Sequence, residues 1–283
     1  MQYVISLDIG GTNLRAAIIN DKYQIVNSLR RSTIVGSVDL FLKQVAEIIT
    51  DLDYKKYNPI AISMGVPGRV RSNGFIDALP NIHIENIPLR EYVEYYFKIP
   101  AMVRNDAEMA GLAEAAIGQG KNLYSTFFIT ISTGVGGAYI QDRKICQYSN
   151  EIGHTLVHYH NSYYELEKIA SGSGIINLCR LNGIEIERTS QFFERIRLRD
   201  TAIFPVFNDW LDILDSFFTD IVAAFSPSII VLTGGVMKSA DVFLDEIIRR
   251  HPEVIIKPAG FDQDAGLIGG AAFGFLNKGS ANK

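Results

Sequence analysis

The sequence predicts an α/β protein built from two domains. A chain of 283 residues is long enough for two domains. Its content of 47% hydrophobic and 20% charged residues is typical of a globular protein with a sizeable core. One order of features occurs twice, namely a strand, a glycine-rich turn and a hairpin, first around DIGGT and again around ISTGVGG. No long linker occurs, so we expect a tight hinge near Gly118–Asn122, between domains at 1–118 and 119–263.

The first half begins with three predicted strands. Tyr3–Leu7, Arg15–Ile19 and Ile25–Arg30 are apolar or β-rich runs separated by turn residues, which favours an antiparallel arrangement. Ser37 precedes a run with apolar residues in helical rhythm, so it is expected to cap a helix. The pattern then predicts a strand in IAISMGV, a turn in GVPG, a strand in AMVRN and a helix in DAEMAGLAEAAIG.

The second half repeats part of this pattern. Ser125–Ser132 reads as a strand, TGVGG as a turn, and Ala138–Ile140 as the start of the next strand. Trp210–Phe225 has the periodicity of a long amphipathic helix, and SIIVLTGGV that of a buried strand followed by a glycine turn. The last segment, Asp264–Leu276, is expected to be a helix whose small residues allow close packing, followed by a disordered tail, GSANK.

Composition excludes several classes of function. The formal net charge is -4 and no basic run occurs, which argues against a nucleic-acid partner. No apolar stretch approaches the roughly 20 residues that a membrane helix needs. The amino terminus lacks the basic region of a signal peptide, and Asp8 interrupts its apolar run. The two cysteines, Cys146 and Cys179, have no metal-binding spacing, so we expect reduced thiols and a cytoplasmic protein.

Three glycine turns, each following a predicted strand, favour phosphate binding. A turn of small residues exposes N–H groups and hydroxyls to phosphate oxygens, and a Cβ would hold the backbone away from the ligand. A single turn of this kind usually just reverses the chain. Two hydroxyl-bearing turns in matched positions, with LTGG as a third, instead predict a nucleotide site.

Two carboxylates stand beside these elements. Asp8 ends the first strand, where it suits hydrated Mg²⁺; a structural acceptor of turn N–H groups is the less favoured alternative. Asp106 follows a strand and opens a helix. Its position fits either a helix N-cap or a general base that takes a proton from a hydroxyl attacking a phosphoryl group.

The motifs together resemble the ROK family of repressors, open reading frames and sugar kinases. The match runs from about residue 5 to about residue 275, in the order DIGGTNLRAAI, SMGVPGRV, RNDAEMAGLAEA, ISTGVGGAYI, EIGH, ELEKIASG and LTGGV. The resemblance implies a two-lobed actin-like ATPase fold, with duplicated ribonuclease-H-like lobes and a cleft between them. It also implies that the helix at about 264–277 returns to the first, small lobe, and that the protein is a homodimer.

The resemblance further implies roles for individual residues. Asp106 corresponds to the catalytic base, and Asp8 lies near Mg²⁺. The ATP-binding positions are Asp8, Gly10, Gly11 and Thr12 in the first phosphate loop, Thr133, Gly134, Gly136 and Gly137 in the second, and Gly234 and Gly235 against the adenosine. The sugar-binding positions are Gly65, Gly68, Asn81, Asn105, Glu151, His154 and Glu167. Paired carboxylates and an imidazole suit a sugar because vicinal hydroxyls offer paired donors and acceptors.

The chain departs from the family between His154 and Glu167. Most relatives carry a cysteine zinc motif there, but the 12 residues between these two include no cysteine. A substitute zinc site formed by His154, His158, His160 and Glu165 is the alternative, but structural zinc sites are usually cysteine-rich, so we expect no zinc. Two smaller departures are Asn150, where glycine is usual, and a loop after Asn81 that lacks a tryptophan common in glucokinases.

The expected function is an ATP-dependent kinase acting on the 6-hydroxyl of a hexose or N-acetylhexosamine. N-acetylmannosamine and glucose are favoured, with fructose and β-glucosides as alternatives. A sugar-responsive transcriptional regulator is the alternative of another class, disfavoured because Asp8 leaves no room for a preceding helix-turn-helix domain. A non-catalytic sugar-binding or actin-like scaffold would lack the base or a phosphate loop, and both are present.

Overall fold

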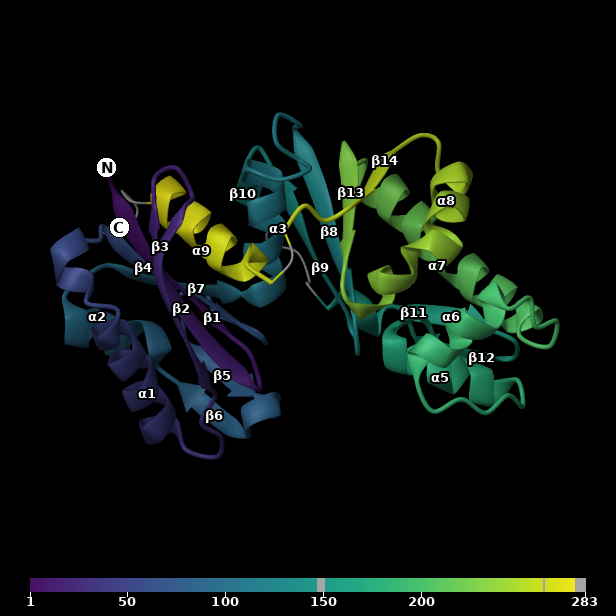
Figure 1. Ribbon diagram of the computed structural model, residues 1–283, viewed down its shortest axis with the longest axis horizontal. Helices are drawn as coiled ribbons and strands as arrows, with labels where there is room; N and C mark the ends of the chain where they lie inside the picture. Colours follow the sequence, from purple (N-terminus) through teal and green to yellow (C-terminus); the bar gives the residue numbers. More distant parts are fainter. Residues whose placement is uncertain (147–150, 262, 278–283) are drawn as a thin grey trace. The chain divides into compact units, whose positions relative to one another are not determined.

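The chain folds into two compact units. The computed structural model describes residues 1–146, 151–261 and 263–277, so Asn150 and the GSANK tail lie outside the described residues. One unit comprises Met1–Ala116 together with Phe261–Lys283, and the other comprises Ile117–Gly260. The carboxyl-terminal segment thus belongs to the same unit as the amino terminus (Figure 1).

The first unit contains a five-stranded sheet in the order β3-β2-β1-β4-β7. The three opening strands pair antiparallel, as predicted, whereas β4 is parallel to both β1 and β7. Two further strands, which the sequence analysis did not predict, form a small antiparallel sheet. The strands are β1 (Tyr3–Ile9), β2 (Asn13–Asn20), β3 (Ile25–Ser32), β4 (Ala61–Val66), β5 (Ile76–Leu79), β6 (Ile84–Ile87) and β7 (Ala101–Asn105).

The helices of the first unit include the predicted carboxyl-terminal one. Its close packing is confirmed, because glycines at every fourth position face β1. A Cβ at Gly266 would lie 2.9 Å from Asp8 Cγ, and one at Gly270 would lie 2.2 Å from Ser6 Oγ. The helices are α1 (Val38–Asp51), α2 (Leu89–Phe97), α3 (Asp106–Ala116) and α9 (Ala265–Leu276), with 3₁₀ turns η1 (Tyr54–Tyr57) and η2 (Pro80–Ile82).

The second unit repeats the strand arrangement of the first. Its sheet has the order β10-β9-β8-β13-β14, with β8 and β10 antiparallel to β9, and β13 parallel to β8 and β14. The predicted duplication is therefore confirmed at the level of topology. The strands are β8 (Ser125–Ile131), β9 (Val135–Gln141), β10 (Lys144–Ile145), β13 (Ile229–Thr233) and β14 (Ile255–Pro258).

The helices of the second unit pack around Trp210. Its fully buried ring has edge contacts with Phe193 and Phe243, and its Nε1 donates to the carbonyl oxygen of Ala170 at 3.0 Å. The predicted helix start at Trp210 was wrong, because Pro205 near the amino-terminal end allows the helix to begin at Phe204. The helices are α4 (Glu167–Ala170), α5 (Gly172–Leu181), α6 (Thr189–Arg197), α7 (Phe204–Phe225) and α8 (Ala240–Arg250), with 3₁₀ turns η3 (Ile152–His154) and η4 (Gly235–Ser239).

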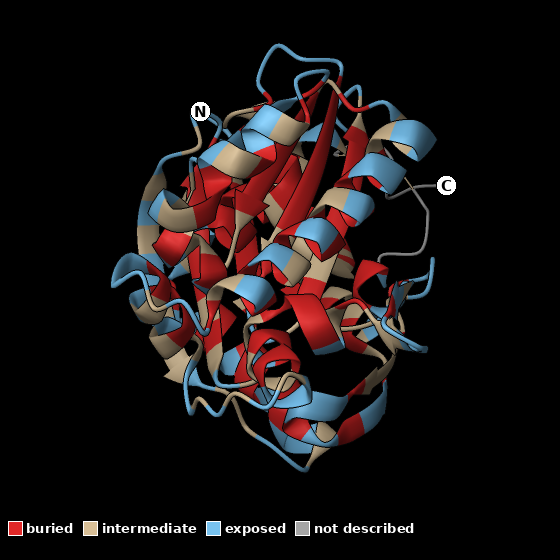
Figure 2. Ribbon diagram, turned by 90° about the vertical axis from the view of Figure 1, so that its right-hand side faces the viewer, coloured by how far each residue is buried: buried red, intermediate tan, exposed pale blue. Residues whose placement is uncertain are grey.

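The short interval after His154 forms a separate β-hairpin. Strands β11 (Leu156–Tyr159) and β12 (Ser162–Glu165) pair antiparallel, and Leu156 lies opposite Glu165. In Figure 2 the long strands are largely buried, whereas the helices alternate buried and exposed segments. Within the described part of the chain, no helix has the length and apolar character needed to cross a membrane.

Candidate functional site

The first glycine turn connects β1 to β2. The Gly10 amide donates to the Asn13 carbonyl oxygen at 2.8 Å, which closes the turn. Asn81 packs against it, since a Cβ at Gly11 would lie only 2.8 Å from the Asn81 Cβ. The structure therefore brings the predicted phosphate turn, which includes Thr12, next to the predicted sugar ligand Asn81.

Asp8 is partly buried at the end of β1, opposite Gly65 of β4. Burial raises the pKa of its carboxyl group, the nearby Arg15 guanidinium lowers it, and the charge of Asp264 raises it again. Arg15 Nη1 lies 3.8 Å from Asp8 Oδ2, and Arg15 also forms an ion pair with Asp264. Asp8 and Asp264 thus share the single positive charge of Arg15, so the two carboxylates are not fully neutralised and could attract a further cation.

Asp106 is the first residue of α3, and the N-cap role falls to its neighbour. Asn105 Oδ1 accepts hydrogen bonds from the amides of Ala107 at 2.9 Å and Glu108 at 3.4 Å. These are the bonds expected of an N-cap residue. Asp106 Oδ1 also accepts from the Ala107 amide, at 2.8 Å. The helix therefore has a cap without Asp106, and a purely structural role for this carboxylate is less favoured.

The surroundings of Asp106 raise the pKa of its carboxyl group toward neutral pH. Burial raises the pKa of its carboxyl group to about 6, and the charges of Asp8 and Glu108 contribute in the same direction against hydrogen bonds that lower it. Gly65 lies beside it, since a Cβ there would be 3.7 Å from the Asp106 Cα. Asn105 Nδ2 donates to the Gly68 carbonyl oxygen at 3.2 Å, so these predicted residues form one group.

The second glycine turn is shorter than the sequence analysis predicted. The turn itself comprises Ser132–Gly134, whereas Gly136 and Gly137 lie within β9, opposite Thr130 and Ile129. A Cβ at Gly137 would lie 2.4 Å from Ile152 Cδ1 and 2.8 Å from the Phe128 carbonyl oxygen. Packing within the unit thus explains why position 137 is glycine, without any ligand.

A pocket of about 420 Å³ lies beside that turn. Both Thr133 and Gly235 line this pocket, as the predicted nucleotide site requires. Gly234, which precedes Gly235 in the chain, has a φ of 102°, a value that favours glycine. Ile176, Phe193 and Val236 supply apolar surface. Sequence reasoning assigned only Thr133 and Gly235 of the lining, because most of it comes from residues of α5, α6 and η4 that lie outside the motifs. The remaining lining residues are Ser132, Gly172, Ser173, Ile176, Thr189, Ser190, Phe193, Val236, Lys238 and Ser239.

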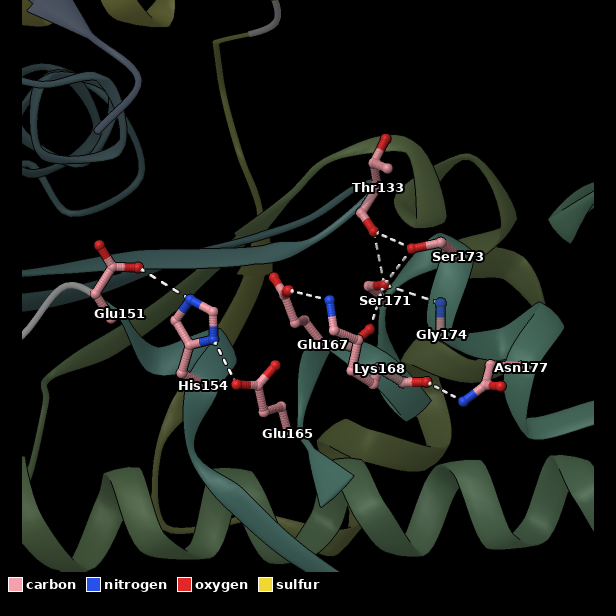
Figure 3. Close-up of polar contacts among 10 residues, drawn as sticks. All are labelled: Thr133, Glu151, His154, Glu165, Glu167, Lys168, Ser171, Ser173, Gly174 and Asn177. Atoms are coloured by element: carbon pink, nitrogen blue, oxygen red, sulfur yellow. Dashed lines mark hydrogen bonds and ion pairs between the residues drawn. The ribbon is translucent and has the colours of Figure 1, made fainter. Parts of the chain in front are cut away.

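The opening of α5 fixes the position of this turn. Ser171 Oγ donates to the Thr133 carbonyl oxygen at 2.8 Å, and Ser173 Oγ donates to the same oxygen. The Gly172 amide donates to the Ser132 carbonyl oxygen at 2.6 Å. Figure 3 shows Ser171 and Ser173 converging on Thr133. These hydrogen bonds therefore join the turn to the start of α5, and both segments contribute residues to the pocket.

A cluster of acids surrounds His154 (Figure 3). Its Nε2 lies 3.6 Å from Glu151 Oε2, and its Nδ1 lies 3.1 Å from Glu165 Oε1. Glu167 reaches the glycine turn, since a Cβ at Gly134 would lie 2.7 Å from its Oε2. The structure thus brings Glu151, His154 and Glu167 into one neighbourhood, as predicted, and adds Glu165, which sequence reasoning did not assign to the sugar site.

The same cluster contains a group with suitable ligand atoms for a metal. Atoms of His154, Glu165 and Glu167 all lie within 4.8 Å of one another, and among the described residues this is the one such group. Neither His158 nor His160 belongs to it, because the ring of His158 contacts Tyr163 and that of His160 stacks on Tyr159. The alternative four-residue set proposed from the sequence does not assemble.

Comparison with known proteins identifies the family. The sequence profile of the ROK family matches residues 4–274. The chain belongs to the ROK family. The ROK hexokinase of Thermus thermophilus has the same fold, with a TM-score of 0.81 and 22% identity over 98% of this chain and 99% of that one. The protein thus has the two-lobed α/β fold of the actin-like ATPases, which the sequence analysis predicted.

Curated ROK relatives include both enzymes and regulators. A glucokinase of Halalkalibacterium halodurans is 27% identical, covering 95% of this chain and 94% of its own. An N-acetylmannosamine kinase of Haemophilus influenzae is 26% identical, covering 94% and 93%. A xylose repressor of Bacillus subtilis is 23% identical, covering 87% of this chain and 67% of the repressor. A sugar kinase activity is therefore supported, and non-enzymatic members occur at similar identity.

Proposed function

We propose that the protein is an ATP-dependent kinase that phosphorylates the 6-hydroxyl of a hexose or N-acetylhexosamine. One observation carries the proposal: Asp106 has a pKa raised to about 6 and stands in the same group as Asn105, Gly65 and Gly68. A general base works best when its pKa lies near the working pH, because it is then ionised yet still basic enough to accept the proton.

Asp106 is assigned the role of removing the proton of the attacking hydroxyl. The oxygen then forms its bond to the γ-phosphorus of ATP, and the bond from that phosphorus to the bridging oxygen of ADP breaks. In phosphoryl transfer the protein acts mainly by positioning the reactants and stabilising charge. Asn105 is assigned the role of binding a sugar hydroxyl. Its hydrogen bond to the Gly68 carbonyl oxygen fixes the direction of its side-chain amide.

The nucleotide is assigned to the glycine turns and the 420 Å³ pocket. The apolar side chains of Ile176, Phe193 and Val236 suit a purine ring, and the Gly234–Gly235 turn suits close approach of the adenosine. Thr133 and Gly134 present hydroxyl and amide groups to phosphate oxygens. The first turn, with Gly10, Gly11 and Thr12, is assigned the same type of contact.

The residues around Asp8 fit a hydrated Mg²⁺ ion. Burial and the charge of Asp264 raise the Asp8 pKa, and a bound cation would favour the ionised carboxylate. Carboxylates that hold Mg²⁺ commonly do so through its water molecules. The ion would neutralise phosphate charge during transfer, and Asp8 would orient it.

The sugar ring is assigned to residues that carry paired acceptors and donors. Glu151, His154 and Glu167 would bind hydroxyls on the anomeric side, and Asn81 would bind another hydroxyl. A site that pairs each hydroxyl discriminates strongly against sugars that lack one, because the unpaired protein group then stays buried without a partner. N-acetylmannosamine and glucose are favoured, with fructose and β-glucosides as the alternatives.

A coupled ADP-release screen tests the function. Glucose, mannose, fructose, N-acetylglucosamine, N-acetylmannosamine and an aryl β-glucoside are compared with ATP and Mg²⁺. Asp106→Asn should lower kcat by about 10²-fold or more, since general base catalysis contributes about that much, while sugar binding by calorimetry is retained. Tyr163→Phe, on an exposed face outside the proposed site, is the control. An unchanged kcat in Asp106→Asn would remove the assignment of the base.

The oligomeric state is proposed to be a homodimer, on the resemblance to the family. Light scattering after size-exclusion chromatography measures it directly. A monomeric mass at micromolar concentration would reject the dimer without affecting the assignment of the kinase.

A further inference from the structure

Tyr159 is attached to two helices by its hydroxyl group. The hydroxyl donates a hydrogen bond to Asp209 Oδ2 of α7 at 2.6 Å and accepts one from Asn182 Nδ2, at the end of α5, at 2.8 Å. Asn182 Nδ2 also donates to the Leu178 carbonyl oxygen at 2.9 Å, so its orientation is fixed. Burial and the bond to Asp209 raise the pKa of Tyr159 to about 12, which keeps the hydroxyl protonated as a donor.

Tyr159 provides the main anchor of the β11–β12 hairpin. Among residues 156–165, all of which the structure describes, Tyr159 alone is buried, whereas Leu156 and Tyr163 are 65% and 70% exposed. A pocket of about 410 Å³ lies between β11 and α7, so the strand does not pack tightly along that helix. The His160 ring stacks on Tyr159 with centroids 4.1 Å apart, and Tyr164 contacts it edge-on at 6.4 Å.

The open end of the same hairpin carries the acid cluster. Leu156 and Glu165 pair across the strands, and the Leu166 amide donates to the Thr155 carbonyl oxygen at 2.8 Å. Glu165 Oε1 lies 3.1 Å from His154 Nδ1, as Figure 3 shows. Each strand is only four residues long, so a displacement at the Tyr159 end reaches Glu165 and His154 with few intervening contacts.

We propose that Tyr159, together with Asp209 and Asn182, is a positioning group that holds the hairpin so that Glu165 orients the His154 ring. The contact with Glu165 holds Nδ1, while Nε2 lies 3.6 Å from Glu151 Oε2, the other carboxylate proposed to bind the sugar. The effect on catalysis rests on the proposed role of His154 in sugar binding. Tyr159 itself contacts no reacting group.

The variant Tyr159→Phe tests the proposal by removing one hydroxyl. A hydrogen bond contributes about 0.5–1.5 kcal/mol, and one to a charged group about 1.5–3 kcal/mol, so we expect the sugar Kd and KM to rise about 3-fold to 100-fold. The Kd for a non-hydrolysable ATP analogue and the kcat should change less than about twofold. Tyr163→Phe, on the exposed face of the same hairpin, is the matched control and should leave all four quantities unchanged.

A conservative pair of variants separates positioning from general destabilisation. Asp209→Asn keeps an oxygen that accepts from the Tyr159 hydroxyl, so it should retain most sugar affinity. Asp209→Leu removes the acceptor while keeping the branched shape of the side chain, and should match Tyr159→Phe. Equal sugar Kd values in both Asp209 variants and the unaltered protein would overturn the proposal.

The imidazole NMR signals give a readout that does not depend on enzymatic activity. The chain contains five histidines, so His154 is assigned by comparison with His154→Gln. Tyr159→Phe should shift the His154 ring nitrogens toward the positions seen in Glu165→Gln, and Tyr163→Phe should not. If no sugar binds the unaltered protein, the proposed function fails, and this shift still decides the positioning claim. Unshifted His154 signals in Tyr159→Phe would refute it.

Discussion

Gly269 of α9 lies so close to Met109 of α3 that a Cβ on the glycine would be 1.6 Å from the Met109 carbonyl oxygen. A backbone atom cannot move aside as a flexible side chain can. Gly269→Ala should therefore lower the free energy of unfolding by more than about 3 kcal/mol, as large overpacking effects do. Urea unfolding measures it. Gly235→Ala, where the added methyl group meets open space, is the control for stability. If Gly269→Ala and Gly235→Ala were equally stable, α3 and α9 could move apart to accept the added methyl group, and the prediction would be wrong.

The reaction rate should depend on pH through Asp106. The carboxylate accepts a proton only when ionised, and its pKa is raised to about 6. We expect kcat/KM to be constant above about pH 7 and to be about tenfold lower at pH 5, because kcat/KM reports the free enzyme. Steady-state rates between pH 5 and 8, with circular dichroism to confirm folding, test it. A constant kcat/KM down to pH 5 would contradict this role for Asp106.

Replacing Asp106 should stabilise the fold at neutral and higher pH. Folding raises the pKa from 3.8 to about 6, so the ionised form is disfavoured in the folded state. The cost is fully present above pH 6 and becomes small as pH falls toward 4, because the unfolded state then also begins to bind the proton. Asp106→Asn should thus be more stable by about 1–3 kcal/mol at pH 8, with little difference at pH 4. Urea unfolding at both pH values measures this. If Asp106→Asn were less stable than the unaltered protein at pH 8, the prediction would be wrong.

A methyl group at Gly134 should weaken sugar binding through Glu167. The added Cβ would lie 2.7 Å from Glu167 Oε2, so the carboxylate must move. We expect Gly134→Ala to raise the sugar Kd about tenfold, equivalent to about 1.4 kcal/mol. In a Glu167→Ala background the same change should cost little, because there is no carboxylate left to displace. Calorimetric titration of the four proteins gives the coupling. Additive effects would show that Gly134 acts on another group.

Local sequence signals predicted part of the fold and of the candidate site. The antiparallel start and the packing of α9 follow from patterns within short segments, whereas the clustering of Glu151, His154 and Glu167 was implied by the resemblance to the family. Apart from Gly172 at the start of α5, helices α5 and α6 lie outside the motifs, so their residues in the 420 Å³ pocket were not predicted. The second glycine turn was predicted to be longer than it is. Sequence alone does not distinguish a glycine required by packing, such as Gly137, from a glycine required by a ligand.

The sequence by itself determined the family, the duplicated strand order and the types of residue available for phosphate and sugar binding. Only the tertiary structure decided which residue caps a helix, which carboxyl group has a raised pKa and what holds the hairpin, because these properties depend on neighbours that are distant in the chain. Asn105 rather than Asp106 caps α3, and burial beside Asp8 sets the Asp106 pKa. The hairpin after His154 is held by Tyr159 on Asp209, which lies 50 residues further along the chain.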